Sequence, residues 1–548
     1  MQDQKLSQNP HATTQKNSRP KRILLWIAAV FLLLVVLAVS AVEVALHRAE
    51  PILRARVIDT LSNRFDSRVE LEHFHVYFLN GFRGSGSGLR LHPNQIDMDK
   101  PLFAVDEFSF RTTWQGLQHT PMYVDRVNLK GVQIHMPPKE ERSNMPKLNG
   151  SGKVKIFVGE ILIENATLVL ETNKPGKVPL DFEISHLTLQ SVGQDQPMKF
   201  HAILVNPKPV GNIDSTGYFG PFDADSPGDS PVRGEYDFSH ADLNTIKGIG
   251  GTLSSTGNYS GTLNNIVVDG ETDTPNFSVD SGNHPMPLHT KFHAIVDGTN
   301  GDTYLQPVDA QLLHSHIVAI GQVVRAPQGG HNITLDVSVG PARIEDLLQL
   351  AVKTEPPIMN GAVTLKTKLV LPPGNASVTN KIQLKGTFAI TNATFSNEKV
   401  QARVDQLSLR GQGKPEEASQ LDKQHPETIQ SQMQGRFELA NSKLTFSSLN
   451  YNVPGADVAL NGVYSLDGNQ FDFHGKARLK AKLSEMISGW KSILLMPVDP
   501  FFSKNGAGTE VPISITGTRS DPQFGLDFGR KDRHQDKNNP PPPDKNSH

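Results

Sequence analysis

The chain contains no cysteine among its 548 residues. This absence excludes disulfides, thiolate zinc sites, iron–sulfur clusters and cysteine nucleophiles. An excess of charge of one sign is also missing, because 54 lysines and arginines nearly balance 56 aspartates and glutamates. Proteins that hold nucleic acid by its phosphates need a basic field. We therefore expect no nucleic-acid partner.

Long hydrophobic runs are missing too, with one exception at residues 23–42, which carry no charge. About twenty residues at 1.5 Å each cross the roughly 30 Å hydrocarbon core of a bilayer, so this run predicts a transmembrane helix. Residues 1–22 carry five basic side chains and one acidic one, which places the N-terminus in the cytoplasm and exports the remainder. The anchor positions are Ile23, Trp26, Phe31 and Val42.

The alternative for this run is a cleaved signal peptide, with Val39 and Ala41 as small residues at the cleavage site. The run exceeds the usual apolar core of about 7 to 15 residues, which favours an uncleaved anchor. Either way, the bulk of the protein is exported.

Helical patterns are few in the exported part. Leu53, Val57 and Leu61 recur at helical spacing and predict a helix over about 51–65. Two further helical faces occur near 342–353 and near 482–496. Elsewhere apolar and polar residues alternate with period two between Gly, Asn, Asp and Pro, which predicts strands with one apolar and one wet face, as in antiparallel sheets.

Four ten-residue segments repeat this alternation in one pattern: 127–136, 161–170, 388–397 and 437–446. Two apolar residues precede a Gly or Asn at the fifth position, after which alternation resumes out of phase. Such a slip predicts a bulge or tight bend at the Gly or Asn; chance similarity within a β-rich chain is the alternative. The apolar positions singled out are Val127, Leu129, Ile161, Ile163, Leu168, Leu170, Phe388, Ile390, Phe437 and Leu439.

Composition shifts divide the chain into consecutive segments. These are a cytoplasmic basic tail (1–22), the membrane span (23–42), an N-terminal β region with its leading helix (43–240), a Gly-rich β meander with the short helix near 342–353 (241–410), a polar loop (411–432), a C-terminal β region with the helix near 482–496 (433–528) and a disordered Pro-rich tail (529–548).

Histidine pairs are the first candidates for chemistry. His73 and His75, and likewise His314 and His316, could each project from one face of a strand as metal ligands. Neither pair has carboxylates at a recognisable spacing, so exposed strand histidines are favoured.

Other motifs are equally incomplete. Residues 488–491 match SxxK but lack the KTG and SDN companions, so packing of a helix face is favoured. The glycines of 84–88 complete neither a phosphate-binding motif nor a nucleophile elbow and indicate a flexible turn. The sequons at Asn165 and Asn392 favour turn chemistry over glycan attachment. We predict no catalytic residue, metal ligand or cofactor, and no enzyme.

The order of elements carries a family resemblance. A basic N-terminus, one anchor and a helix lead into RVELEHFHVYFLNGFRGSGSGLRL (68–91), followed by PLFAVDEFSFR (101–111) and VDRVNLKGVQIHM (124–136). The chain closes with GAGTEVPISITGTRSDPQFGLDF (506–528). This arrangement resembles the AsmA family of Gram-negative envelope proteins, which are similar in architecture to bridge-like lipid carriers. The resemblance spans most of the exported chain, through patterns of alternation.

The resemblance implies a mainly β fold in which the transmembrane helix precedes a long, curved antiparallel sheet, an open β-groove lined by apolar side chains, with a few short amphipathic helices. Periodicity alone leaves stacked β-sandwich domains as the alternative. The implied protein sits in the inner membrane with its bulk in the periplasm. Its implied partners are phospholipids, the inner membrane and outer-membrane or other envelope proteins.

The implied function is to bind phospholipid acyl chains in the groove and to support lipid transport and outer-membrane biogenesis. Apolar surface exposed to water costs about 25 cal/mol per Å², which a bound acyl chain would relieve. The alternative is a scaffold or assembly factor for outer-membrane proteins that works without lipid transfer. An envelope hydrolase is the least favoured, because no acid/base pair or supported nucleophile can be assembled.

Overall fold

The computed structural model describes residues 50–526 except for a few internal segments, and these residues belong to two compact units, Met1–Pro179 and Leu180–His548. The segments outside the description are 64–65, 78–80, 95–99, 138–155, 172–178, 194–195, 224–225, 327–329, 354, 421–427, 466–469, 487–507 and 519–520.

Within the described residues, no helix is long and apolar enough to cross a membrane. The predicted span at 23–42 and its anchor positions lie outside these residues, as do the tails 1–22 and 529–548. Of the helix expected near 482–496, only η4 (Leu483–Met486), a 3₁₀ turn, is described.

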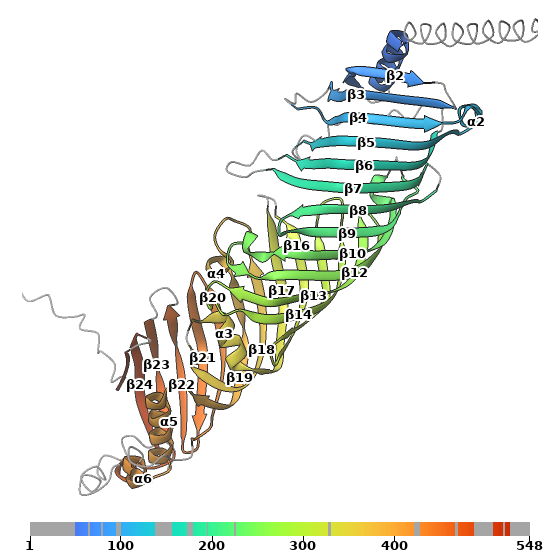
Figure 1. Cartoon of the computed structure of the whole chain (residues 1–548). Coiled ribbons are helices and arrows are strands. Elements are labelled where there is room, and N and C mark those ends of the chain that lie inside the picture. Colours follow the sequence, from blue (N-terminus) through green and yellow to red (C-terminus); the bar gives the residue numbers. More distant parts are fainter. Residues whose placement is uncertain are drawn as a thin grey trace, which may run out of the picture. The chain divides into compact units, whose positions relative to one another are not determined.

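The first unit is a short twisted sheet preceded by a helix at residues 50–63 (Figure 1). Its strands are antiparallel except that β6 pairs with β5 in parallel. They are β1 (Ser67–Glu70), β2 (His73–Tyr77), β3 (Phe82–Pro93), β4 (Phe103–Thr112), β5 (Met122–Met136) and β6 (Ile156–Leu170), with α2 (Trp114–Gln118) between β4 and β5.

The leading helix belongs to the core of this unit. Leu53 and Val57 pack on a buried cluster that includes Leu71 and Phe74. The apolar residues at helical spacing therefore form the buried face of this helix, as expected. The Arg54 Nε also donates to the Leu71 carbonyl at 2.7 Å, which ties the helix to the strand side of the core.

The second unit is one long antiparallel succession in which each strand pairs with its neighbours along the chain, with one exception. Its strands are β7 (Leu180–Val192), β8 (Met198–Pro207), β9 (Val210–Phe219), β10 (Pro231–Asp242), β11 (Ile249–Gly250), β12 (Thr252–Thr262), β13 (Asn265–Val279), β14 (Met286–Val296), β15 (Thr303–Leu312), β16 (Ser315–Arg325), β17 (His331–Arg343), β18 (Met359–Leu371), β19 (Gln383–Phe395), β20 (Ser431–Ala440), β21 (Lys443–Val453), β22 (Ala456–Ser465), β23 (Gln470–Leu479), β24 (Thr509–Thr518) and β25 (Pro522–Leu526). The exception is the short β11, which pairs with β13 while β10 pairs with β12.

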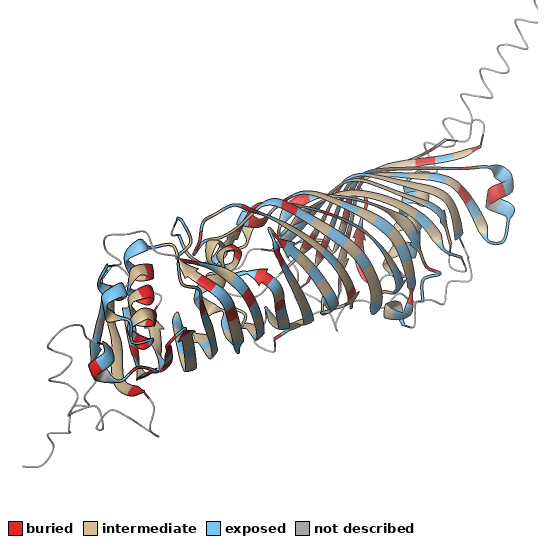
Figure 2. Cartoon of the chain, turned by 90° about the horizontal axis from the view of Figure 1, so that it is seen from below, coloured by how far each residue is buried: buried red, intermediate tan, exposed pale blue. Residues whose placement is uncertain are grey.

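In each unit, the described strands are joined by hydrogen-bonded ladders into a single sheet. The stacked β-sandwich alternative is therefore wrong for this part of the chain, and an open sheet takes its place. Buried, intermediate and exposed positions alternate along the strands (Figure 2).

Because neighbouring strands run in opposite directions, their connections alternate between two edges of the sheet. One edge, the helix edge, carries η3 (Leu243–Thr245), α3 (Ile344–Ala351) and α5 (Glu398–Gly411). The opposite edge carries α4 (Val378–Lys381). The helix α3 is the one expected near 342–353, whereas α5 was not predicted.

The helix α5 starts at an Asn397 cap, whose side chain accepts from the Lys399 and Val400 amides. It leads into α6 (Pro415–Gln420), which lies inside the segment 411–432 expected to be a polar loop.

The out-of-phase repeat corresponds to a backbone feature. Its fifth residues Gly131, Asn165 and Asn392 lie within β5, β6 and β19 and have φ values of 65°, 55° and 55°. The fourth, Asn441 (φ 51°), and Ser442 (φ 59°) form the two-residue turn between β20 and β21. Gly and Asn are the residues that adopt this left-handed conformation most readily, so the prediction of a bulge or tight bend is confirmed.

Asn392→Val is expected to lower stability by about 1–2 kcal/mol, because a left-handed backbone is unfavourable for residues with a branched Cβ. Asn392→Gly, which removes that strain, should melt close to the unmodified chain. Thermal melting of the two variants checks this, and a valine variant as stable as the glycine variant would contradict the assignment of the bulge.

The glycine-rich segment 84–88 is strand, not a turn as expected. It lies within β3, where Gly84 is opposite Phe110 and Gly86 is opposite Phe108. A Cβ added at either glycine would overlap the facing phenyl ring. The glycines therefore make room for rings that lie flat over the strand, a use of glycine that depends on the neighbouring strand.

Candidate functional site

One face of the second unit carries no charge. Cross-strand partners form a row that crosses the unit from β7 to β24. Its members are Ile184, Leu204, Ile213, Phe238, Ser255, Thr272, Thr290, Ala310, Ile317, Val339, Leu365, Phe388, Gly435, Leu449, Leu460, Gly475 and Ile513.

Two further rows on the same face, which pass through Val337 and Leu335 of β17, are also free of charged residues. Charged residues make up 20 % of the whole chain, so the exclusion follows the face and not the local composition. We call these three rows the apolar face.

The opposite face of the same strands is charged. One of its rows runs through Asp214, Asp237, Glu271, Lys291 and Asp309. The two faces differ because side chains alternate along a strand with period two, and the polar set falls on one side throughout.

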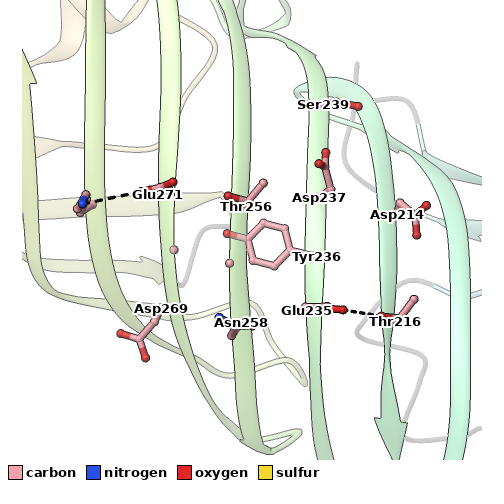
Figure 3. A pocket seen from close by; sticks show the side chains of 13 residues that line it. Asp214, Thr216, Glu235, Tyr236, Asp237, Ser239, Thr256, Asn258, Asp269 and Glu271 are labelled. Atoms are coloured by element: carbon pink, nitrogen blue, oxygen red, sulfur yellow. Dashed lines mark hydrogen bonds and ion pairs between the residues drawn. The ribbon is translucent and has the colours of Figure 1, made fainter.

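The charged face is hollowed over β9 to β14 (Figure 3). The hollow has a volume of about 860 Å³ and is lined by carboxylates. Within it, Lys291 lies 4.0 Å from Glu271 and Thr216 donates to Glu235 at 3.3 Å. No cluster of potential metal ligands occurs in the described part of the chain. A lining of this kind suits water and not an apolar ligand.

Tyrosines on the uncharged side of the sheet remain neutral. The Tyr236 hydroxyl lies 3.1 Å from Ser255 Oγ, and that of Tyr259 lies 2.8 Å from Ser215 Oγ. Burial raises the pKa of both phenols, and it raises the pKa of Tyr451 to about 12. These three tyrosines therefore add no charge to this side of the sheet at neutral pH.

Aromatic rings line the part of the apolar face from β19 to β23. The centroid of the Phe388 ring lies 6.2 Å from that of Phe437 and 6.0 Å from that of Phe446, two strands away. A Cβ at Gly435, between these strands, would lie 3.0 Å from the Phe388 ring. The missing side chain thus lets the rings converge into a continuous apolar surface.

Helices cover the apolar face along the helix edge. Residues beside the helix edge, such as Val363 and Ile390, are 3 % and 5 % exposed under α3. Farther from the helix edge, Leu369 of β18 and Leu439 of β20 are only half-buried. Within the described residues, the rows beyond the helices thus keep apolar area accessible to solvent.

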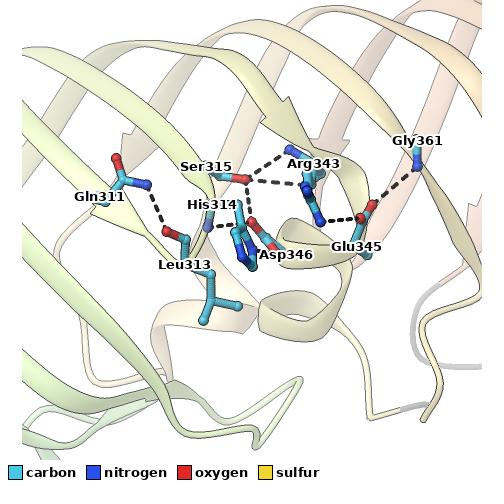
Figure 4. Close-up of polar contacts among 8 residues, drawn as sticks. All are labelled: Gln311, Leu313, His314, Ser315, Arg343, Glu345, Asp346 and Gly361. Carbon is cyan, nitrogen blue, oxygen red and sulfur yellow. Dashed lines mark hydrogen bonds and ion pairs between the residues drawn. The ribbon is translucent and has the colours of Figure 1, made fainter.

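The helix α3 is fixed to this margin by a buried carboxylate (Figure 4). Asp346, 3 % exposed, accepts from the His314 amide at 3.0 Å and from Ser315 Oγ at 2.8 Å. The preceding residue, Glu345, accepts from the Gly361 amide at 3.2 Å. These bonds join α3 to the turn between β15 and β16 and to β18.

Asp346→Ala is expected to destabilise the protein by about 1–3 kcal/mol, since two donors lose their buried acceptor. Asp309→Ala is the matched control: Asp309 pairs with His316 at 3.1 Å on the exposed charged face, where such pairs contribute about 1 kcal/mol or less. Equal melting temperatures for the two variants would refute the anchoring role.

Within the described residues, a hydrogen bond joins the two edges of the sheet. The Val378 amide, at the start of α4, donates to the Lys247 carbonyl at 3.1 Å. Lys247 follows η3 on the helix edge, whereas α4 lies on the opposite edge. A contact between opposite edges requires the sheet to twist and curl between β10 and β19. We call this contact the strap.

All ten apolar positions predicted from the repeat lie on strands, and within each unit they share one face of the sheet. In the first unit, Val127 and Leu129 pair with Ile161 and Ile163, and Leu168 and Leu170 continue the same strand. In the second unit, Phe388, Ile390, Phe437 and Leu439 share one side of β19 and β20. Ile390 differs from the others in being covered by α3.

Sequence reasoning missed Tyr236, Tyr259 and Phe292 of the uncharged face. A glycine within a strand pattern is the sequence signal that could have indicated them, because it can make room for large neighbouring rings. A Cβ at Gly270 would meet both Tyr236 and Phe292. The pairing that brings these residues together is not local.

The histidine pairs do not form metal sites within the described residues. His73 lies 3.1 Å from Ser87 Oγ and His316 lies beside Asp309, so both are used in cross-strand contacts. The SxxK segment 488–491 lies outside the described residues.

Comparison with known proteins adds no relationship to this geometry. No protein-family model matches the chain, and no match was found among curated proteins or among solved structures.

Proposed function

We propose that this protein is anchored in the inner membrane and holds phospholipid acyl chains along an apolar groove in the periplasm, in support of lipid transport and outer-membrane biogenesis. The observation that carries the proposal is the apolar face of the second unit: three rows without a charged residue, on a sheet whose other face is charged. The uncharged span at 23–42 and the resemblance to the AsmA family agree with it.

The physical argument starts from exposed apolar area. Ordinary soluble sheets cover such a face with a second layer, whereas the described helices that pack on this face, α3 and α5, lie along one margin of it. Each acyl methylene transferred from water to an apolar surface contributes roughly 0.8 kcal/mol. A phospholipid whose chains lie along the half-buried rows would supply the missing layer, with its headgroup in water.

Curvature supports a groove in preference to a flat face. Bulged strands bend and twist a sheet, and register shifts recur through the second unit, in β10, β15, β17 and β19. The strap adds a closing contact between the segment after η3 and the start of α4. An acyl chain inside this bend would meet apolar side chains on more than one side.

A scaffold or assembly factor for outer-membrane proteins remains the second candidate. No observation on the described residues favours it over lipid binding.

The test is direct extraction and mass spectrometry of lipid from the full chain purified in mild detergent. Co-purified phospholipid should remain after detergent washing that strips a single-pass control protein carrying residues 1–49 alone. A chain that carries no more lipid than this control, but cross-links to envelope proteins, would refute the proposal and favour the scaffold.

A further inference from the structure

Three arginines stand side by side on the first unit. Arg83 of β3 is opposite Arg111 of β4, and Arg111 is opposite Arg126 of β5. All three side chains are exposed. The row continues to Tyr77 on β2 and to Glu160 on β6.

This row, the arginine ladder, has an excess of positive charge. Arg126 pairs with Glu160 at 2.6 Å. Within the described residues, neither Arg83 nor Arg111 has a carboxylate within ion-pair distance. Like charges directly opposite each other on a sheet are destabilising. An external anion would turn that repulsion into attraction.

Exposed aromatic and aliphatic side chains gather at the same edge of the sheet. Tyr77 is 55 % exposed at the end of β2, and Trp114 is 52 % exposed at the start of α2, three residues after Arg111. Tyr123 and Ile156, at the starts of β5 and β6, are 37 % and 42 % exposed. Trp and Tyr favour the boundary between water and lipid, where one end of the ring is wet and the other apolar.

The geometry points to a docking surface for an anionic phospholipid bilayer, formed by the arginine ladder with Tyr77 and Trp114 beside it. Guanidinium groups bind phosphate through paired hydrogen bonds, and the rings would enter the headgroup layer. Charge complementarity selects this occupant. The position of the first unit in the chain agrees with a bilayer as the occupant. The uncharged span at 23–42 ends shortly before the helix at 50–63, which leads into this unit.

This surface is distinct from the proposed groove. The ladder belongs to the first unit, whereas the three uncharged rows belong to the second. A chain that binds no acyl chain in its groove would still dock, and a chain that fails to dock would still bind lipid in detergent. The two proposals therefore fail independently.

The experiment uses the full chain reconstituted in lipid nanodiscs, so that residues 23–42 are present in every sample. Trp26→Phe and Trp490→Phe leave Trp114 as the sole tryptophan. Quenching of Trp114 fluorescence by brominated phospholipid reports docking. We expect strong quenching in discs that contain phosphatidylglycerol, weak quenching in phosphatidylcholine discs, and loss of the difference at high salt.

The decisive variant is Arg83→Gln, Arg111→Gln and Arg126→Gln combined. Each basic residue near an anionic surface contributes about 1 kcal/mol, so the docking equilibrium should fall on the order of 100-fold. The lysine version of the same triple should retain docking and shows that the strands still form. Lys366→Gln, Lys368→Gln and Lys385→Gln is the charge-matched control on exposed positions of β18 and β19, and it should dock normally.

Three results would overturn the inference. The first is equal Trp114 quenching in neutral and anionic discs. The second is a glutamine triple that docks as well as the lysine control. The third is a glutamine triple that loses cross-links to an acidic protein while its Trp114 quenching stays at the unmodified level. This result would assign the ladder to a protein partner.

Discussion

Replacing Leu369 or Leu439 by aspartate is expected to remove most bound phospholipid while the melting temperature stays nearly unchanged. Both leucines lie on the apolar face and are only half-buried. A carboxylate against acyl chains loses its hydration without gaining a partner, which costs several kcal/mol, so lipid content should fall at least about tenfold. Folding is affected less, because the new charge remains solvated when no lipid is bound.

The control for this result is Ile320→Asp. Ile320 lies on β16 with its side chain on the charged face and is 50 % exposed. The Ile320→Asp variant also replaces an aliphatic strand residue by aspartate, but on the other face. The lipid content of this variant should stay at the level of the unmodified chain. Lipid phosphorus and mass spectrometry of the purified full chain measure both. Equal lipid content in the three variants would refute the apolar face as the binding surface.

Ile390→Asp is a less informative variant than the sequence alone implies. Ile390 is 5 % exposed and packs in the cluster beneath α3. A charge there would destabilise the core whether or not lipid binds, because a buried unpaired carboxylate is strongly unfavourable. Substitutions at the half-buried Leu369 and Leu439 separate an effect on lipid binding from an effect on folding. A substitution at the covered Ile390 does not.

Locking the strap is expected to slow the exchange of bound lipid by about tenfold or more, since a ligand beneath a closed contact leaves only when the contact opens. The chain has no native cysteine, so Lys247→Cys with Val378→Cys gives a single oxidisable pair. The two backbones already share a hydrogen bond at 3.1 Å. Exchange of a fluorescent phospholipid is compared between the oxidised and reduced forms of this one protein.

Val378→Pro is the opposite perturbation. It removes the amide that donates to Lys247, yet proline fits the first position of a helix, and the preceding Ser377 has an extended backbone (φ −58°, ψ 154°) that proline tolerates. Loss of one hydrogen bond worth about 1 kcal/mol should speed exchange roughly fivefold. If neither the disulfide nor the proline changes the rate of lipid exchange, lipid does not pass beneath the strap.

Local chemistry explains which features were predictable from the sequence. Alternation of apolar and polar residues is a local pattern, so the strands and their apolar sides follow from it. Asn165 and Asn392 adopt left-handed backbones because their side chains tolerate that conformation, and this preference also lies within the residue itself.

The features that were not predicted depend on distant neighbours. The glycines at 84 and 86 belong to a strand because Phe110 and Phe108 of the next strand lie over them. The strap joins residues 247 and 378 through the bend of the intervening sheet. The helix α5 is a different case, since its Asn397 cap and the spacing of Val400, Val404 and Leu407 are visible in the sequence and were overlooked.

The arginine ladder is also a product of pairing. Arg83, Arg111 and Arg126 are widely separated in the sequence, and the near-zero net charge of the chain hides them. Only the register of β3, β4 and β5 places them in one row. Composition excluded a basic field over the whole protein, but a local one is compatible with it.

The most direct test of the central claim is photo-crosslinking of the full chain with a phospholipid that carries a diazirine in its acyl chain, followed by peptide mapping. Adducts are expected on the apolar face, at half-buried positions such as Leu335, Leu369 and Leu439. They should be depleted on the charged face of the same strands, including Ile320. Adducts confined to residues 23–42, or spread equally over both faces of the sheet, would contradict the account.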